Sequence, residues 1–187
     1  MNDESSRTGI YITFNNVIEI GPCNSLMAKL SEIAFNQPMA TVHLLINSTG
    51  GSLASGLGLF NFLQLIPLDI VSVNFGYVGS IANLVFLASR KRMALPDSQF
   101  FFHDFTWTSG AETIPQSVIT ERSVQIDAFK ACFVKALKER TQVFDGSGQP
   151  FDPFKPSIMD SRAAAAVGIA TEHALVIPAT MQMAWVI

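Results

Sequence analysis

Between residues 41 and 105 the sequence alternates short apolar runs with helical patterns, and turns that contain glycine separate several of them. Four apolar runs have the length of buried strands, at residues 41–47, 69–75, 92–95 and 99–105. The first of them is nearly continuous, which predicts a strand buried on both faces of a parallel sheet. Two segments with the composition of helices lie between them, at residues 53–66 and 80–89. Alternation of strands and helices with short loops predicts an α/β fold, with right-handed crossovers and helices that cover the sheet.

The residues before this alternation predict two short strands and one helix. Runs rich in β-forming residues occupy positions 10–14 and 17–20, on either side of a turn signal. A helix is expected to start at Asn24 and Ser25 and to end before Pro38. The buried face of this helix would carry Leu26, Leu30, Ile33 and Ala34.

A long helix is expected from about residue 114 to residue 143, and Pro115 suits its first turn. A helix of this length exceeds what one compact layer can pack, so it is expected to project and to meet another subunit. A loop rich in glycine and proline follows at residues 144–156.

The last part of the sequence predicts a short helix and a short strand. Asp160 stands at the N-cap of a helix over residues 161–168, and Gly168 ends that helix. The strand is expected at residues 174–178. The apolar residues 181–187 are expected either to dock on the fold or to lie at an interface.

Composition narrows the classes of function. A chain of 187 residues suits one domain, and 49% hydrophobic with 14% charged residues predicts that self-association hides apolar surface. A net charge of −3 gives no electrostatic case for nucleic-acid binding. The three scattered histidines have no metal-ligand spacing, and no glycine-rich phosphate motif follows a strand. We therefore expect neither a metal nor a cofactor.

The sequence also predicts where the protein works. Cys23 and Cys132 lie far apart and form no C-x-x-C pair, which suits a reducing compartment. The first residues are polar and acidic and lack the pattern of a secretory signal. Pro67 and Asp69 interrupt the longest candidate for a membrane span. A cytoplasmic location without membrane contact is the expectation.

Ser80 is the first candidate for chemistry. It follows Gly76 and Gly79 at the end of an apolar run and opens an apolar segment. A serine at such a turn projects into the crevice at the carboxyl edge of the sheet, where α/β proteins bind ligands. The N–H groups at the start of a helix would favour a developing oxyanion there. Taken alone, the same position is more typical of a helix N-cap than of a nucleophile.

Two further features lie in the same stretch. Gly50 and Gly51 follow a predicted strand and let the backbone turn sharply, either as a simple turn or as a wall of a substrate cleft. In the second case the Gly51 N–H would be an oxyanion donor beside that of Ile81. His103 is either a core histidine or a general base, and as a base it must reach the hydroxyl of Ser80.

Together these segments resemble the ClpP family, the proteolytic subunits of the Clp protease in the ClpP/crotonase superfamily. The family's S-P-G-G-S turn, G-x-A-A-S-M segment, K-R-x-x-L-P turn and M-I-H-Q-P strand correspond here to residues 48–52, 76–81, 91–96 and 101–105. The resemblance extends over residues 10–177. It implies a repeated β-β-α superhelix in one domain over residues 1–187. The head of that domain would comprise residues 10–110 and 150–180, and the projecting handle helix residues 114–143.

The resemblance also implies roles for residues and partners. Ser80 would be the nucleophile, His103 the general base, and the N–H groups of Gly51 and Ile81 the oxyanion hole. The handle helix would interlock two stacked rings of seven subunits around a closed chamber. An AAA+ unfoldase would then feed unfolded peptide substrates into the chamber, and an active ClpP paralogue is a further possible partner.

One member of the family's catalytic triad lacks a counterpart. The family has an aspartate before the last helix, and counting back from Gly168 places Pro156 at that position. Asp160 and Asp152 are the two candidate replacements. Otherwise the site is a Ser-His dyad or has lost activity, because loss of a triad aspartate can cost about four orders of magnitude in rate.

Three hypotheses of function follow. The first is a ClpP-like serine endopeptidase that uses Ser80 and His103. The second is a non-catalytic ring subunit that scaffolds or regulates an active paralogue, and the missing aspartate supports it. The third is a crotonase-type acyl-CoA enzyme, against which the presence of both Ser80 and His103 argues.

Overall fold

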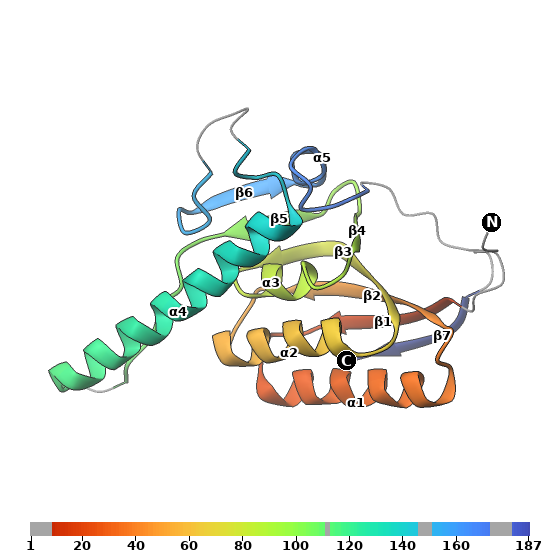
Figure 1. Ribbon diagram of the computed structural model, residues 1–187, viewed down its shortest axis with the longest axis horizontal. Helices are drawn as coiled ribbons and strands as arrows, with labels where there is room; N and C mark the ends of the chain where they lie inside the picture. Colours follow the sequence, from red (N-terminus) through yellow and green to blue (C-terminus); the bar gives the residue numbers. More distant parts are fainter. Residues whose placement is uncertain (1–8, 111–112, 146–150, 173–180) are drawn as a thin grey trace.

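The computed structural model describes residues 9–110, 113–145, 151–172 and 181–187, with side-chain burial left out at 181–184. In this part of the chain, one seven-stranded sheet carries helices (Figure 1). The strand order is β6-β5-β3-β2-β1-β7, and β4 pairs with β3 beside this path. The β5–β6 pair is antiparallel and the other pairs are parallel. The predicted α/β class is confirmed.

The described strands are Gly9–Asn15 (β1), Thr41–Ser48 (β2), Asp69–Gly79 (β3), Lys91–Ala94 (β4), Gln99–Phe102 (β5), Ser157–Asp160 (β6) and Met181–Val186 (β7). The described helices are Ile20–Asn36 (α1), Leu53–Leu65 (α2), Ala82–Phe86 (α3), Gln116–Arg140 (α4) and Ser161–Ala166 (α5). Strand β6 was not expected from the sequence. The strand predicted at 174–178 lies outside the described residues.

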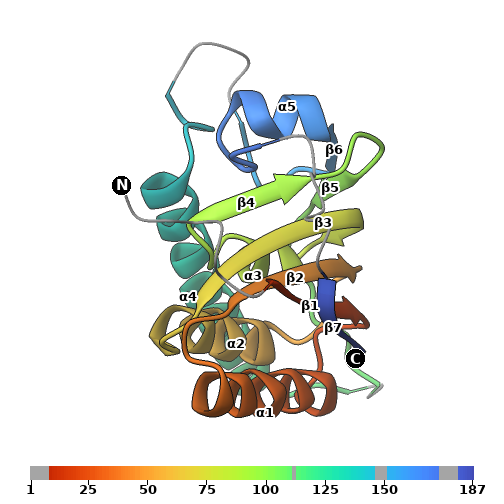
Figure 2. The ribbon, with the colours of Figure 1, turned by 90° about the vertical axis from the view of Figure 1, so that its right-hand side faces the viewer.

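One face of the sheet is buried under helices. Strands β1 and β2 run parallel, with Ile10 beside Val42 and Ile12 beside Leu44, and these four side chains are fully buried. Helices α1 and α2 lie side by side along this layer (Figure 2). Each large apolar side chain buried here stabilises the fold by about 1.5–3 kcal/mol. The expectation that residues 41–47 are buried on both faces is wrong, because buried and half-buried residues alternate along β2.

The start of α1 corrects the sequence prediction. The predicted strand at 17–20 is absent, since Ile18 makes only an isolated bridge with Gly51 and α1 begins at Ile20. Pro22 fits the first turn of α1 because N–H groups there need no helical partner. The predicted buried face is confirmed at three positions and gains Cys23, whereas Ala34 is half-buried; the buried residues are Cys23, Leu26, Leu30 and Ile33.

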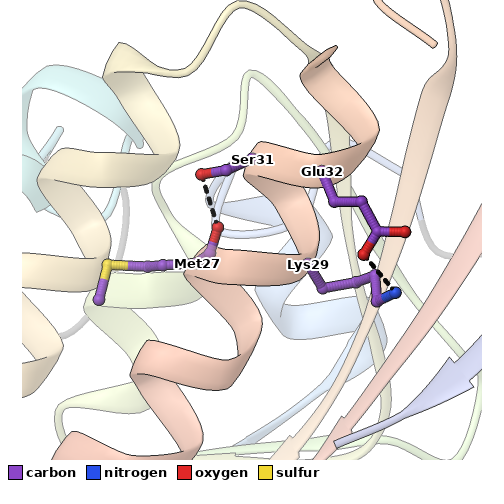
Figure 3. Close-up of polar contacts among 4 residues, drawn as sticks. All are labelled: Met27, Lys29, Ser31 and Glu32. Atoms are coloured by element: carbon purple, nitrogen blue, oxygen red, sulfur yellow. Dashed lines mark hydrogen bonds and ion pairs between the residues drawn. The ribbon is translucent and has the colours of Figure 1, made fainter. Parts of the chain in front are cut away.

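Polar contacts join neighbouring turns of α1, as Figure 3 shows. Lys29 forms an ion pair of 2.7 Å with Glu32, and the Ser31 hydroxyl donates a hydrogen bond of 2.9 Å to the Met27 carbonyl. The Lys29 ammonium also lies 4.5 Å from the centre of the Trp185 ring in β7. Lys29 therefore links α1 to β7. The apolar residues 181–187 do dock on the fold, as a strand parallel to β1.

Helix α4 is shorter than the predicted 114–143 and contacts the body mainly through one half. Its buried residues are Phe133, Ala136 and Leu137, all in the C-terminal half. The N-terminal half extends away from the sheet (Figure 1) and exposes Ile119 and Val124. The predicted projection of this helix is confirmed.

Arg92, in β4, is only 5% exposed, and its guanidinium group joins three segments of the fold. Its five guanidinium N–H groups donate to five backbone carbonyls at 2.7–3.2 Å, those of Ser89, Arg90, Arg140, Gly168 and Ile169. Desolvation, and then the charge of Arg140, lowers the pKa of Arg92 to about 10. The side chain therefore stays charged at neutral pH, and every donor has an acceptor.

His43 is a structural histidine in β2. Its ring stacks on Tyr11 of β1 with ring centres 4.7 Å apart, and its Nδ1 atom is buried without a hydrogen-bond partner among the described residues. Desolvation and the charge of Lys91 lower the pKa of His43, while Asp69 opposes them. The folded chain therefore disfavours the protonated imidazole.

Folding stability is expected to fall as the pH drops below about 6.5, the ordinary pKa of histidine. The unfolded chain gains a proton at His43 there, and the folded chain binds that proton less readily. Urea unfolding at pH 7.5 and pH 5 would measure the decline, with His43→Phe as the comparison. A decline of the same size in His43→Phe would contradict this assignment.

Candidate active site

Ser80 lies in the turn between β3 and α3, at the carboxyl edge of the parallel strands. Its φ is 55°, and among the described residues no other non-glycine residue has a positive φ. This conformation costs about 1–3 kcal/mol and persists only where neighbours hold it in place. The Ser80 N–H donates to the Phe101 carbonyl at 3.0 Å, which attaches the turn to β5.

The glycine turn lies directly against Ser80. A Cβ atom at Gly50, whose φ is +100°, would lie 2.7 Å from the Ser80 Cβ and 3.3 Å from its Oγ. Gly79 is equally close to this turn, since a Cβ there would lie 3.2 Å from the Thr49 carbonyl oxygen. The fold therefore brings together the serine and the glycine turn that the sequence singled out.

Among the described residues, the N–H groups of Gly51 and Ile81 are left free beside the Ser80 turn. The Ile18 N–H donates to the Gly50 carbonyl at 2.8 Å, and the Ser52 N–H donates to the Ile18 carbonyl at 2.7 Å. These bonds fix the turn without using the Gly51 N–H. Within the described ranges, neither the Gly51 nor the Ile81 N–H donates a hydrogen bond. Both groups have the free donor that an oxyanion hole requires, and this role stays a prediction.

His103 follows β5 directly, because that strand ends at Phe102 and not at the predicted residue 105. Its half-buried ring stacks on Phe101 at a centre-to-centre distance of 5.0 Å. Among the described residues, no hydrogen bond joins His103 to Ser80 or to a carboxylate. Ser80 and His103 are nevertheless connected through Phe101, whose carbonyl accepts the Ser80 N–H two residues before His103.

Asn83 is a positioning residue that the sequence analysis missed. It is only 2% exposed in α3, and its side-chain amide donates to the Ser80 carbonyl at 3.1 Å and to the Phe101 carbonyl at 2.8 Å. It thus clamps the serine turn onto the strand that leads to His103. A buried polar residue in an otherwise apolar short helix was the available signal, since such residues need specific partners.

Neither candidate aspartate forms a hydrogen bond or an ion pair with His103 among the described residues. In the β5–β6 register Gln99 pairs with Asp160 and Phe102 with Ser157, which places Pro156 opposite His103. Asp160 therefore lies four positions along the strand from His103, about 13 Å. Its carboxylate caps α5 by accepting the Ala163 N–H at 2.8 Å, as predicted.

Asp152 and Asp104 have other local partners. The exposed Asp152 accepts the N–H of Phe154 at 2.9 Å, which forms a local turn. Asp104 forms an ion pair of 2.6 Å with Lys130 of α4. The count from Gly168 gives Pro156 as the counterpart of the family's aspartate, and the β5–β6 register extends to the same residue opposite His103; this equivalence stays a prediction.

Asp160→Ala is expected to lower the free energy of unfolding by about 1 kcal/mol, because the Ala163 N–H loses its acceptor. Asp160→Asn keeps the cap and should retain most of that stability. Reaction of Ser80 with a fluorophosphonate, a probe for activated serines, should proceed at the same rate in all three chains. A tenfold slower reaction in both variants would instead make Asp160 part of the site.

The described residues contain no group of three histidine, cysteine or carboxylate side chains placed to hold a metal ion. No helix in the same ranges is both long and apolar enough to cross a bilayer.

The sequence is similar to those of known Clp protease subunits. The family model of the Clp protease matches residues 7–172. A proteolytic subunit of the ATP-dependent Clp protease from Bdellovibrio bacteriovorus is 24% identical over 72% of this chain and 62% of its own length. One from Bacteroides fragilis is 32% identical over 69% of this chain and 59% of its own length. The chain thus spans about three fifths of the length of these relatives.

A solved structure matches the fold as well. A point mutant of ClpP1 from Listeria monocytogenes superimposes with a TM-score of 0.71, over 89% of this chain and 91% of that one, at 17% identity. This likeness concerns the fold alone. The family model, which matches residues 7–172 and so most of the chain, identifies the chain as a member of the Clp protease family.

Proposed function

We propose that this protein is a serine endopeptidase of the ClpP type, with Ser80 as nucleophile and His103 as general base. The observation that carries the proposal is the strained Ser80 turn. Ser80 has a left-handed backbone and packs against Gly50, and two free amide N–H groups, of Gly51 and Ile81, flank it. Such strain at a ligand-facing edge is typical of functional residues.

The reaction follows from these groups. The Ser80 Oγ attacks the carbonyl carbon of the scissile peptide bond while His103 takes the hydroxyl proton. The N–H groups of Gly51 and Ile81 donate to the oxyanion that forms. His103 then gives its proton to the leaving amine, and the C–N bond breaks to leave an acyl ester on Ser80. Water, deprotonated by His103, hydrolyses the ester and restores the serine.

The test is reaction with a fluorophosphonate followed by mass spectrometry of the adduct. We expect the label on Ser80, and its loss in Ser80→Ala and His103→Ala. Ser89 is a matched control, because its buried hydroxyl accepts a hydrogen bond of 2.8 Å from Ser72 and lies outside the turn. Ser89→Ala should label like the unchanged chain. Folded protein that carries no label on Ser80 would refute the peptidase proposal.

The alternative is a non-catalytic ClpP-like ring subunit that scaffolds or regulates an active paralogue. Two observations favour it. No hydrogen bond joins Ser80 to His103 within the described residues, and Pro156, which the register places opposite His103, carries no carboxylate. The labelling experiment separates the two functions, since a scaffold needs no reactive serine.

The assembly implied by the resemblance belongs to the same proposal. The exposed apolar residues of the projecting half of α4, Ile119 and Val124, suit contact with a second copy of the chain. Stacked heptamers around a chamber, fed with unfolded peptides by an AAA+ unfoldase in the cytoplasm, are the proposed setting.

A further inference from the structure

A polar cleft of about 510 Å³ lies at the carboxyl ends of β1, β2 and β3. Its lining combines three asparagines with two hydroxyl side chains, one tyrosine and one valine, and it includes Asn15, Asn16, Asn47, Thr49 and Tyr77. Among the described residues that line the cleft, none carries a charge. The cleft is therefore neutral, and its hydrogen-bonding groups lie beside apolar surface.

The cleft and the serine turn share one wall. Thr49 lines the cleft, and its carbonyl oxygen would lie 3.2 Å from a Cβ at Gly79. The next residue, Gly50, packs against the Ser80 side chain. A peptide held at Ser80 can therefore place a neighbouring side chain in this cleft.

A relay of hydrogen bonds orients the side-chain amides of Asn47 and of the exposed Asn15. The Tyr77 N–H donates to the Asn47 Oδ1 at 2.9 Å, so the Asn47 Nδ2 is free to donate to the Asn15 Oδ1, at 2.7 Å. Gly76 permits this approach, because a Cβ there would lie 2.8 Å from the Asn47 Oδ1. The Asn15 Nδ2 is left as a donor without an acceptor among the described residues.

We propose that this cleft is a substrate subsite that selects side chains with an uncharged hydrogen-bond acceptor, the carboxamides of glutamine and asparagine. The inference rests on the proposed function only in taking the ligand to be a peptide. An aliphatic side chain would leave the Asn15 donor unpaired. A carboxylate would lose hydration without meeting a cation.

Binding to the Ser80→Ala chain tests the proposal, because no turnover is needed. Fluorescent peptides would carry glutamine, leucine or glutamate at each position in turn, and anisotropy would give the dissociation constants. At one position we expect glutamine to bind about 3- to 10-fold more tightly than the other two. Uniform affinities, or no binding of any peptide, would overturn the proposal.

Two variants in the Ser80→Ala background sharpen the test. Asn15→Asp keeps an acceptor for Asn47 and removes the donor, so the glutamine preference should vanish; Asn15→Leu should lose it as well. Asn36→Leu, at an exposed residue on the last turn of α1, should retain the preference. A preference that survives in Asn15→Asp would overturn the role of Asn15. Because these measurements need no nucleophile, their failure is distinct from a failure of Ser80 labelling.

Discussion

The His103→Ala variant is expected to hydrolyse peptides about 10²- to 10⁴-fold more slowly than the unchanged chain, the usual contribution of a general base. The loss should appear in kcat, because the base is removed while the fold is kept. Among the described residues, the stacking on Phe101 is the main contact of His103 with the fold. Steady-state kinetics with a fluorogenic peptide would measure it.

Added imidazole distinguishes a lost base from a distorted site. A diffusing base can occupy the space left by His103 and restore part of the rate, whereas it cannot repair a displaced Ser80. His43→Gln is the matched control, because His43 stacks on Tyr11 in the sheet. It should keep the full rate at pH 7.5. A His103→Ala chain within twofold of the original rate would exclude His103 as the base.

Replacement of Arg92 by methionine should lower the free energy of unfolding by about 3–5 kcal/mol. Methionine fills much of the same space but donates no hydrogen bond, so five carbonyl oxygens lose their common partner. A loss of this size is a large share of the about 5–15 kcal/mol that stabilises an ordinary domain. Urea unfolding followed by circular dichroism would measure it.

Two substitutions serve as comparisons for Arg92→Met. Arg92→Lys keeps the charge but offers three donors in place of five, so an intermediate loss is expected. Arg90→Met removes a nearby exposed guanidinium and should change stability by less than about 0.5 kcal/mol. Equal losses of stability in Arg92→Met and Arg90→Met would contradict a specific contribution of the five Arg92–carbonyl hydrogen bonds to the stability of the fold.

The sequence predicts well those elements whose pattern reflects a local rule. Strand β2 and the cap of α5 by Asp160 follow from an apolar run and from capping chemistry. The start of α1 was misplaced because residues 17–20 have β propensity, which carries little weight where Pro22 opens a helix. Strand β6 is a four-residue partner of β5, and so short a strand is set by its neighbour and not by its own sequence.

The sequence predicted that Ser80 and the glycine turn lie together, but it did not predict the hydrogen bonds around them. Glycine spacing located Ser80 and its turn, since only glycine permits the close approach of Gly50. The role of Asn83 depends on carbonyl groups of Ser80 and Phe101 that meet through the fold, so a polar residue in an apolar segment signals a need for partners but does not say which ones. The relay from Tyr77 through Asn47 to Asn15 likewise joins three strands.

The pairing of β1 with β7 affects how a newly made chain reaches this fold. Gly9 pairs with Met181, which the ribosome adds 172 residues later, so one edge of β1 stays open during most of synthesis. At about 5–20 residues per second this interval lasts roughly 10–30 s. An open strand edge can pair with other nascent chains. Pairing of this open edge with other chains is therefore a hazard of translation that ends once β7 covers β1.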